Sequence, residues 1–350
     1  MSLKVIRVQN MAQFSSFLGL AELIYGRNSR TALANRRETV FLFDPRTNPT
    51  LHHVRLALFL ALQNERPVGR IACAVDEYCR EETTGFFGAF EAVPDEQIAL
   101  ALLEAAGRWL QGEKCRRMVG PATVNTNQRV GLLIEGFSAP PAFALPYNPP
   151  YYQELFENCR CKKLTDLLAF QWLAGEPLPE EIKRVARRAR RYAGTKVYPL
   201  NAGLPLNRQV EAIHYILNHS MERNWGYISL TRQEVLSMLR YYQRVADPRL
   251  LLLARVGQHP VGICFCIPHT EGAAGGKSAF RLALLAVLPE FRQRGIEALL
   301  LEACHAGLPP HSLIEMSQIH EDNSVVLKMV RRVNPDPPAK RYRVYEVDLS

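Results

Sequence analysis

Residues 284–296 read LLAVLPEFRQRGI, and the order of elements in this stretch sets the architecture. The apolar start predicts the end of a buried strand, and Pro289 and Gly295 mark a turn before an apolar helix. Such a turn at a helix N-terminus offers backbone N–H groups and a favourable dipole to an anion. Arg292 and Arg294 add guanidinium groups that pair well with phosphate oxygens. The sequence therefore predicts an anion site here.

The order of elements around this turn occurs twice in the chain. The second half has a hairpin with the turn Pro260-Val261-Gly262, and the first half has the matching turn Pro67-Val68-Gly69. Each hairpin is followed by a long strand that ends in proline, a helix, a short strand, a second helix and a closing strand. The closing strands are predicted at 164–172 and 341–349. An internal repeat of this kind indicates a duplicated domain.

Each half therefore reads as an α/β (α+β) domain, with a mixed, mostly antiparallel sheet flanked by helices. We predict a first domain over residues 1–172, a linker rich in glycine and proline over 173–181, and a second domain over 182–350. The second helix of the first half is predicted near 128–135, and that of the second half near 324–331.

Composition is that of a soluble protein of two domains. The chain has 350 residues, of which 47% are hydrophobic and 22% charged, and its formal charge of +9 suits an anionic ligand without selecting one. The first residues lack the apolar core of a signal peptide, and apolar runs are too short to span a bilayer. The eight cysteines lack the spacing of zinc ligands. We therefore expect a cytoplasmic protein with reduced thiols, no metal and no membrane partner.

The basic turn resembles the acetyl-CoA motif of the GNAT superfamily of N-acetyltransferases, which reads Gln/Arg-x-x-Gly-x-Gly/Ala. Residues Arg292 to Ile296 fit its first five positions, and Glu297 stands where the family has glycine or alanine. Gly120-Pro121 and Tyr147 to Tyr152 are among the segments that resemble uncharacterised bacterial tandem GNAT-like proteins. The resemblance implies a tandem GNAT fold that uses acetyl-CoA or a related acyl-CoA as co-substrate.

The resemblance also implies where the coenzyme binds. The matching turn of the first half contains Asp95 and Glu96 and no glycine, so the first domain is expected to lack a coenzyme site. In the family, the strand before the turn pairs with pantetheine, and a later helix begins with an asparagine and carries a tyrosine where this chain has Val330. The expected cofactor contacts are Leu285, Val287, Arg292, Gln293, Arg294, Gly295, Ile296 and Asn323. For Asn323, helix capping is the competing interpretation.

Catalysis in this superfamily is direct attack of an amine on a thioester, assisted by a base and an acid. Glu290 is the main candidate for the base, with Glu321 and His320 as alternatives. Because the usual tyrosine is missing, Tyr342 or Tyr345 on the closing strand is the candidate for the acid.

Two aromatic loops are candidates for substrate binding. Tyr147 and Tyr151 lie in a stiff, proline-rich segment that either walls a pocket or packs as a lid on the first core. Asn224, Trp225 and Tyr227 lie between helices of the second half, where the segment either contacts substrate or is a turn anchored by a buried tryptophan.

Three functions are consistent with these features. The leading hypothesis is an N-acyltransferase that acts on a small-molecule or peptide amine, as a monomer or homodimer. The alternative is an inactive tandem protein that binds acyl-CoA or a partner as a sensor or scaffold. The basic stretch Lys183 to Arg191 could contact nucleic acid. A solvated connector helix explains that stretch better, which disfavours nucleic acid as a partner.

Overall fold

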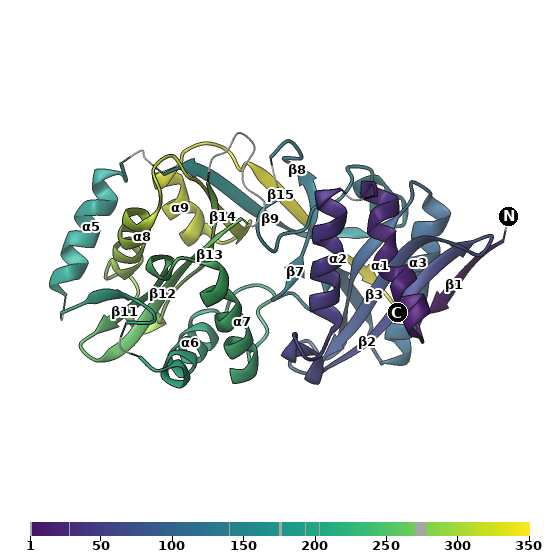
Figure 1. Ribbon diagram of the computed structural model, residues 1–350, viewed down its shortest axis with the longest axis horizontal. Helices are drawn as coiled ribbons and strands as arrows, with labels where there is room; N and C mark the ends of the chain where they lie inside the picture. The colour runs from purple at the N-terminus through teal and green to yellow at the C-terminus, as the bar shows by residue number, and fades with distance from the viewer. Residues whose placement is uncertain are drawn as a thin grey trace. The chain divides into compact units, whose positions relative to one another are not determined.

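The computed structural model contains two compact units, each built around its own series of paired strands (Figure 1). Unit 1 comprises Met1–Phe137, Ala144–Asp166 and Tyr342–Ser350, and unit 2 comprises Ser138–Phe143 and Leu167–Arg341. The structure describes residues 2–27, 29–139, 141–174, 177–192, 194–202, 204–269 and 278–350. Residues 175 and 176 of the expected linker and residues 270–277 of the glycine-rich loop lie outside the described residues.

In unit 1 the strand order is β1-β2-β3-β4-β5-β15, and every neighbouring pair but the parallel β4–β5 is antiparallel. The sheet strands are β1 (Leu3–Arg7), β2 (Val54–Gln63), β3 (Arg66–Asp76), β4 (Thr84–Ala92), β5 (Arg117–Gly120) and β15 (Lys340–Asp348). Its helices are α1 (Met11–Tyr25), α2 (Arg30–Phe43), the short 3₁₀ helix η1 (Pro49–His52), α3 (Glu96–Gly112) and α4 (Tyr152–Asn158).

The two faces of this sheet are covered by different helices. Alternate residues of β2 point to opposite faces. Ala57, Phe59 and Ala61 belong to the core that includes α3, whereas Leu60 and Leu62 pack with α1 (Figure 1). The helices α1 and α3 therefore each stabilise one face of the sheet by burying apolar surface.

In unit 2 the strand order is β9-β14-β13-β12-β11-β10, with β13 and β14 parallel. The strands are β9 (Lys162–Leu173), β10 (Lys196–Pro199), β11 (Leu251–Val256), β12 (His259–Pro268), β13 (Ala279–Val287) and β14 (Leu313–His320). The helices are α5 (Glu180–Arg191), α6 (Leu206–Ser220), α7 (Arg232–Val245), η2 (Pro248–Leu250), η3 (Pro289–Phe291), α8 (Ile296–Gly307) and α9 (Ser324–Val333).

The closing strand of each half of the chain pairs mainly with strands of the other unit. Residues 167–173 of β9, from the first half, pair with β14 in unit 2. Residues 345–348 of β15, from the end of the chain, pair with β5 in unit 1. The strand periodicity at 164–172 and 341–349 predicted both strands, but the predicted domain ranges assigned each to its own half. The units therefore differ from those ranges by this exchange.

The shared Pro-Val-Gly sequence lies near the start of β3 and of β12, and its glycine is required by packing. A side chain at Gly69 would lie 2.8 Å from Leu102 Cδ1 of α3, and one at Gly262 would lie 2.9 Å from the Ala286 carbonyl and 3.3 Å from Leu300 Cδ1 of α8. The helix that follows the long strand packs onto the hairpin at this point in both units, and only glycine leaves room for it.

The prediction of a helix near residues 128–135 is wrong. The segment contains the short strands β7 (Arg129–Val130) and β8 (Leu132–Glu135), and β7 pairs with β6 (Ala122–Thr123). Gly131 separates β7 from β8 with a φ of +94°, a conformation that glycine adopts readily and a helix excludes.

Candidate functional site

The predicted anion turn begins helix α8, as its glycine requires. Gly295 has a φ of +79° and is the N-cap of α8, and Gln293 also has a positive φ, of 61°. The turn follows β13 through η3, so Arg292 to Ile296 lie between a buried strand and a helix N-terminus. This local structure is the one predicted from the sequence.

Both arginines of the turn already have partners in unit 2. Arg292 donates from Nε to the Val287 carbonyl at 3.1 Å and from Nη2 to the Ser220 carbonyl at 2.6 Å. The Arg294 guanidinium lies over the rings of Tyr192, at 4.7 Å, and Phe291, at 5.3 Å. A diphosphate bound here would have to compete with these contacts.

Helix α5 and Glu297 also occupy the turn. A side chain at Gly295 would lie 2.6 Å from Val185 Cγ1 of α5, so α5 packs directly on the start of α8. The Glu297 carboxylate accepts its own backbone N–H, and burial raises its pKa above the usual value. A carboxylate at this amide repels a diphosphate while it is ionised. Coenzyme binding at Arg292–Ile296 stays a prediction, and these contacts oppose it.

The strand predicted to pair with pantetheine separates from its neighbour. Parallel pairing of β13 and β14 ends at Leu282↔Met316. A β-bulge at Ala283 occurs just beyond that point, where β13 continues to pair with β12 through Leu285 and Val287. The Asn323 side chain accepts the Val326 N–H at 3.2 Å and caps α9, which is the competing role expected for it.

Two aromatic residues fix the loop after α6. Tyr227 forms a hydrogen bond to α6, and Trp225 packs against the end of β14. The Tyr227 hydroxyl donates to Asn218 Oδ1 at 2.7 Å, and burial raises the pKa of that phenol. Trp225 stacks on His320, with ring centroids 5.4 Å apart, at the end of β14. Asn224 is exposed and its amide contacts Met221 Sδ at 2.9 Å. Trp225 and Tyr227 therefore hold the loop in place, and only Trp225 reaches the sheet.

The three predicted catalytic residues belong to different units. Glu290 is exposed in η3 of unit 2. Tyr342 and Tyr345 are each 1% exposed and belong to unit 1, because β15 is exchanged. The Tyr345 ring stacks on Phe156 at 5.5 Å, and burial raises the pKa of its hydroxyl. These tyrosines are core residues of unit 1.

Unit 1 contains a polar cavity that the sequence did not predict. A β-bulge places Ala89 and Phe90 of β4 opposite the single residue Ile71 of β3, and beyond it Glu91 lies opposite Arg70. The cavity opens beside this bulge and has a volume of about 50 Å³. Its polar lining includes Tyr25, Asn35, Arg70, Glu91, Tyr147 and Tyr152.

Glu91 is the centre of a buried hydrogen-bond network in this cavity. Its Oε1 accepts from Asn35 Nδ2 at 2.7 Å and from the Tyr25 hydroxyl at 3.1 Å, and its Oε2 accepts from the Tyr152 hydroxyl at 2.7 Å. The Arg70 guanidinium lies 3.7 Å from Oε1, and Arg70 and Glu91 are 1% and 3% exposed. The buried carboxyl group is therefore surrounded by three hydrogen-bond donors and one cationic side chain.

The two tyrosines keep their protons in this setting. Burial, and then the charge of Glu91, raise the pKa of Tyr25 and of Tyr152 well above 10. Both therefore act as donors to Glu91 at neutral pH. A carboxylate accepts about four hydrogen bonds. Among the described residues, Oε2 accepts one, so it can accept one more from a ligand.

The predicted aromatic loop of the first half does reach this cavity. The Tyr147 carbonyl lies 3.1 Å from the Tyr25 hydroxyl and shares its single hydrogen with Glu91 Oε1, and Tyr147 contributes to the lining. The Tyr151 hydroxyl donates to the Ala92 carbonyl at 2.8 Å, and burial raises its pKa to about 12. Segments that carried the family resemblance, including Pro121 and Asn148, line the same cavity. The sequence does contain a signal for this cavity, because Arg70 and Glu91 each lie within an otherwise apolar strand.

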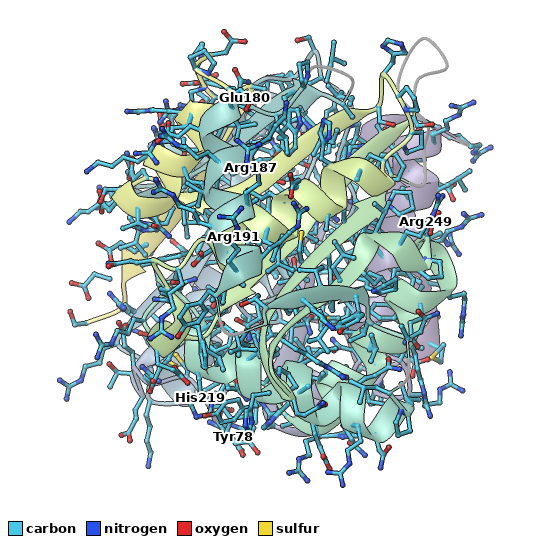
Figure 2. All side chains as sticks on the ribbon, turned by 90° about the vertical axis from the view of Figure 1, so that its left-hand side faces the viewer. Tyr78, Glu180, Arg187, Arg191, His219 and Arg249 are labelled. Carbon is cyan, nitrogen blue, oxygen red and sulfur yellow. The ribbon has the colours of Figure 1, made fainter. Side chains whose placement is uncertain are left out.

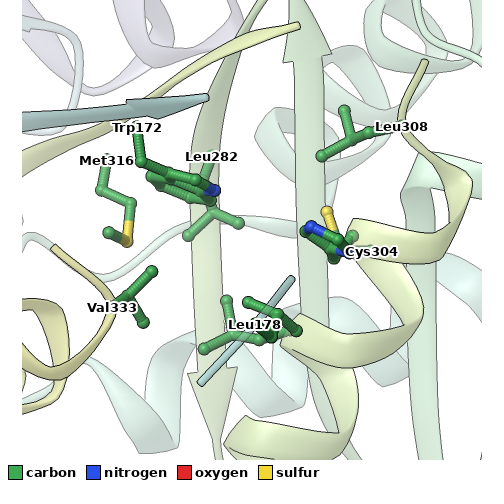
Figure 3. Close-up of a pocket in the computed structure, with 9 residues that line it drawn as sticks. Trp172, Leu178, Leu282, Cys304, Leu308, Met316 and Val333 are labelled. Carbon is green, nitrogen blue, oxygen red and sulfur yellow. The ribbon is translucent and has the colours of Figure 1, made fainter. Parts of the chain in front are cut away.

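A second cavity, in unit 2, has no comparable chemistry. Figure 3 shows its lining, which includes Trp172, Leu282 and Met316 of the strands and Cys304 of α8. Apolar side chains dominate it, so it is best described as a packing void. Cys304 lies beside Cys264 and Cys266 of β12, in the core. Among the described residues, no cluster of histidine, cysteine or acidic side chains could hold a metal ion.

Comparison with known proteins identifies the fold. No family model matches the chain. Protein YghO of Escherichia coli K12 is 26% identical over 391 residues, covering 97% of this chain and 98% of that protein. The bacterial ceramide synthase of Caulobacter vibrioides is 26% identical over 379 residues, covering 99% and 98%.

Solved structures agree. A tandem GNAT protein from the clavulanic acid biosynthesis pathway matches with a TM-score of 0.60 at 12% identity, covering 100% of this chain and 99% of that one. A GCN5-related N-acetyltransferase from Sphaerobacter thermophilus matches with a TM-score of 0.53 at 14% identity, covering 99% and 96%. The chain therefore has a tandem GNAT fold, and both the resemblance and the fold class predicted from the sequence are confirmed.

Proposed function

We propose that the chain is an acyl-CoA-dependent N-acyltransferase whose acceptor amine binds in the cavity of unit 1. The observation that carries the proposal is the Glu91 carboxyl group in a GNAT-fold unit, buried beside a strand bulge and hydrogen-bonded by two tyrosine hydroxyls. Buried titratable groups gathered in a polar cavity are typical of catalytic and binding sites.

The chemistry follows from the hydrogen-bond capacity of Glu91. An ammonium group donates to Oε2, which has one acceptor position beyond the Tyr152 hydroxyl. The Glu91 carboxylate takes one proton from the ammonium group, and the neutral amine nitrogen then bonds to the thioester carbonyl carbon. The carbon–sulfur bond breaks, and the coenzyme leaves as a thiolate that takes up the second proton, which the nitrogen loses as the amide forms. The products are an amide and free coenzyme A.

The acceptor is proposed to be an amphiphilic amine. A relative that aligns over nearly the whole chain is named a ceramide synthase, and a ceramide is the amide of a fatty acid and a long-chain amino alcohol. The cavity combines a carboxylate for an ammonium group with apolar lining from Leu42, Phe90 and Leu132. The donor is proposed to be acetyl-CoA or a longer acyl-CoA.

An assay of coenzyme release tests this function. The full chain is incubated with acetyl-CoA or palmitoyl-CoA and each of three amines: a long-chain amino alcohol, a short polyamine and a peptide with a free N-terminus. We expect thiol release that depends on the amine, with the long-chain amino alcohol the best acceptor, and an amide product detected by mass spectrometry. Thiol release with no amine dependence, or none with any pair, would contradict the proposal.

One observation favours a second candidate, an inactive tandem protein that binds a ligand. Glu297 and the engaged arginines leave the α8 turn poorly suited to a diphosphate. Calorimetry with acyl-CoA in the same preparations separates the two functions. Binding heat without thiol release supports a sensor or scaffold, whereas turnover with any amine excludes it.

A further inference from the structure

Helix α5 carries a stripe of arginines on the side opposite its buried face. Arg184, Arg187, Arg188 and Arg191 recur at spacings of three and four, which places them within an arc of roughly 100° on an α-helix. All four are exposed. Figure 2 looks onto this helix, with Arg187 and Arg191 on its outward side. We refer to these four residues as the arginine stripe.

The other side of α5 fixes it to unit 2. Ile182, Ala186 and Ala189 are buried against Ala298 and Leu299 of α8. The stripe therefore belongs to a helix held by apolar packing and faces away from that packing.

Acidic residues neutralise little of the stripe. Arg187 lies 3.7 Å from Glu180, which also pairs with Lys183 at 3.0 Å. Within the described part of the chain, Arg184, Arg188 and Arg191 have no ion-pair partner. Four positive charges on neighbouring turns of one helix repel one another, and this repulsion lowers the stability of the helix. Water leaves the repulsion in place, whereas binding to an anionic surface offsets it.

The basic surface continues beyond both ends of α5. Near its start, the exposed Arg332 of α9 pairs with Glu181 at 3.3 Å, which places its guanidinium next to the helix. At its end, Arg294 stacks on Tyr192, the C-cap of α5. Further guanidinium groups of unit 2 therefore lie near both ends of α5.

We propose that the arginine stripe docks unit 2 on an anionic lipid bilayer. Neighbouring basic side chains on one helix suit a plane of lipid phosphates, and their attraction is electrostatic and salt-sensitive. Nucleic acid fits less well, because the outward positions hold no aromatic side chain to stack on a base and no amide to read one. The outward positions also lack apolar residues, so the helix lies on the surface without inserting. None of the described helices is long and apolar enough to cross a membrane.

A vesicle sedimentation assay with the full chain tests the docking. The probes are vesicles of phosphatidylcholine alone and of phosphatidylcholine mixed with phosphatidylglycerol. The variant is R184Q/R188Q, and the matched control is R208Q/R240Q, which removes the same charge from exposed positions on α6 and α7. Thermal unfolding of each variant checks that its fold is kept.

We expect the protein to sediment with the mixed vesicles only, and less as salt is raised. Each arginine near an anionic surface is worth roughly a five-fold change in partitioning, so R184Q/R188Q should bind about 25-fold more weakly. The control should lose far less. No binding to the mixed vesicles at low salt, or equal loss in both variants, would overturn the proposal. Tighter binding to a DNA duplex than to vesicles, lost in R184Q/R188Q, would assign the stripe to nucleic acid instead.

Discussion

At the scale of residues, the candidate site rests on Glu91 and Arg70. The sequence places both in apolar strand runs, and this pattern predicts strands well but does not reveal which charged side chains meet. Their pairing depends on the bulge at Ala89, which shifts the register so that Glu91 faces Arg70. A one-residue change in register alters which residues are opposite, and short sequence patterns do not specify it. The loop residue Tyr147, by contrast, could be predicted because its segment resembles the family.

At the scale of elements, the start of helix α8 was the best-predicted feature. Its glycine, positive φ and preceding strand all follow from local sequence. The contact with α5 does not, because it depends on tertiary packing of Val185 against Gly295. Helix α5 was recognised as basic, but only its packing on α8 shows which arginines face outward.

The carboxylate of Glu297 should make coenzyme binding at α8 depend on pH. Burial raises its pKa, so the group is neutral below that pKa and charged above it. We expect coenzyme A affinity, measured by calorimetry, to fall as pH rises through the Glu297 pKa, and E297Q to lose that fall and bind more tightly at high pH.

A control on the same helix isolates this effect. E302Q removes another carboxylate of α8, one that pairs with Arg190 at 2.5 Å. It should keep the wild-type pH dependence. The phosphates of coenzyme A change their protonation with pH in the same way whichever protein is present. The effect of Glu297 is therefore the difference in the pH dependence of affinity between wild type and E297Q. Identical pH profiles for wild type and E297Q would mean that the diphosphate binds elsewhere.

At the scale of the whole molecule, the duplication could be predicted and the exchange of closing strands could not. The alternating pattern at 341–349 predicts an extended, half-buried segment, but it does not indicate which strand this segment pairs with. The two units have sheets of the same order, so either β9 or β15 suits the same position beside β5 or β14. The catalytic roles predicted for Tyr342 and Tyr345 assume that the last strand pairs within the second half of the chain, whereas both residues belong to unit 1.

Hydrogen exchange can detect the strand exchange directly. Tyr345 lies opposite Gly120 and is buried with Phe156, so Y345A should destabilise unit 1 by about 3–5 kcal/mol, as aromatic truncations in a core do. Mass spectrometry should find faster amide exchange in β4 and β5. I314A, in the core of unit 2, should instead affect β13 and β14. Faster exchange in β14 than in β5 on Y345A would refute the assignment of β15 to unit 1.

The role of Glu91 is tested most directly by the yield of amide from E91Q. The variant keeps the shape of the side chain and one acceptor oxygen but cannot take a proton. With acyl-CoA and the best amine, we expect amide formation to fall by roughly 10²- to 10⁴-fold, the scale of a lost acid–base group. The control E104Q, on the exposed side of α3, should keep wild-type turnover. Wild-type turnover by a folded E91Q protein would contradict a catalytic site in unit 1.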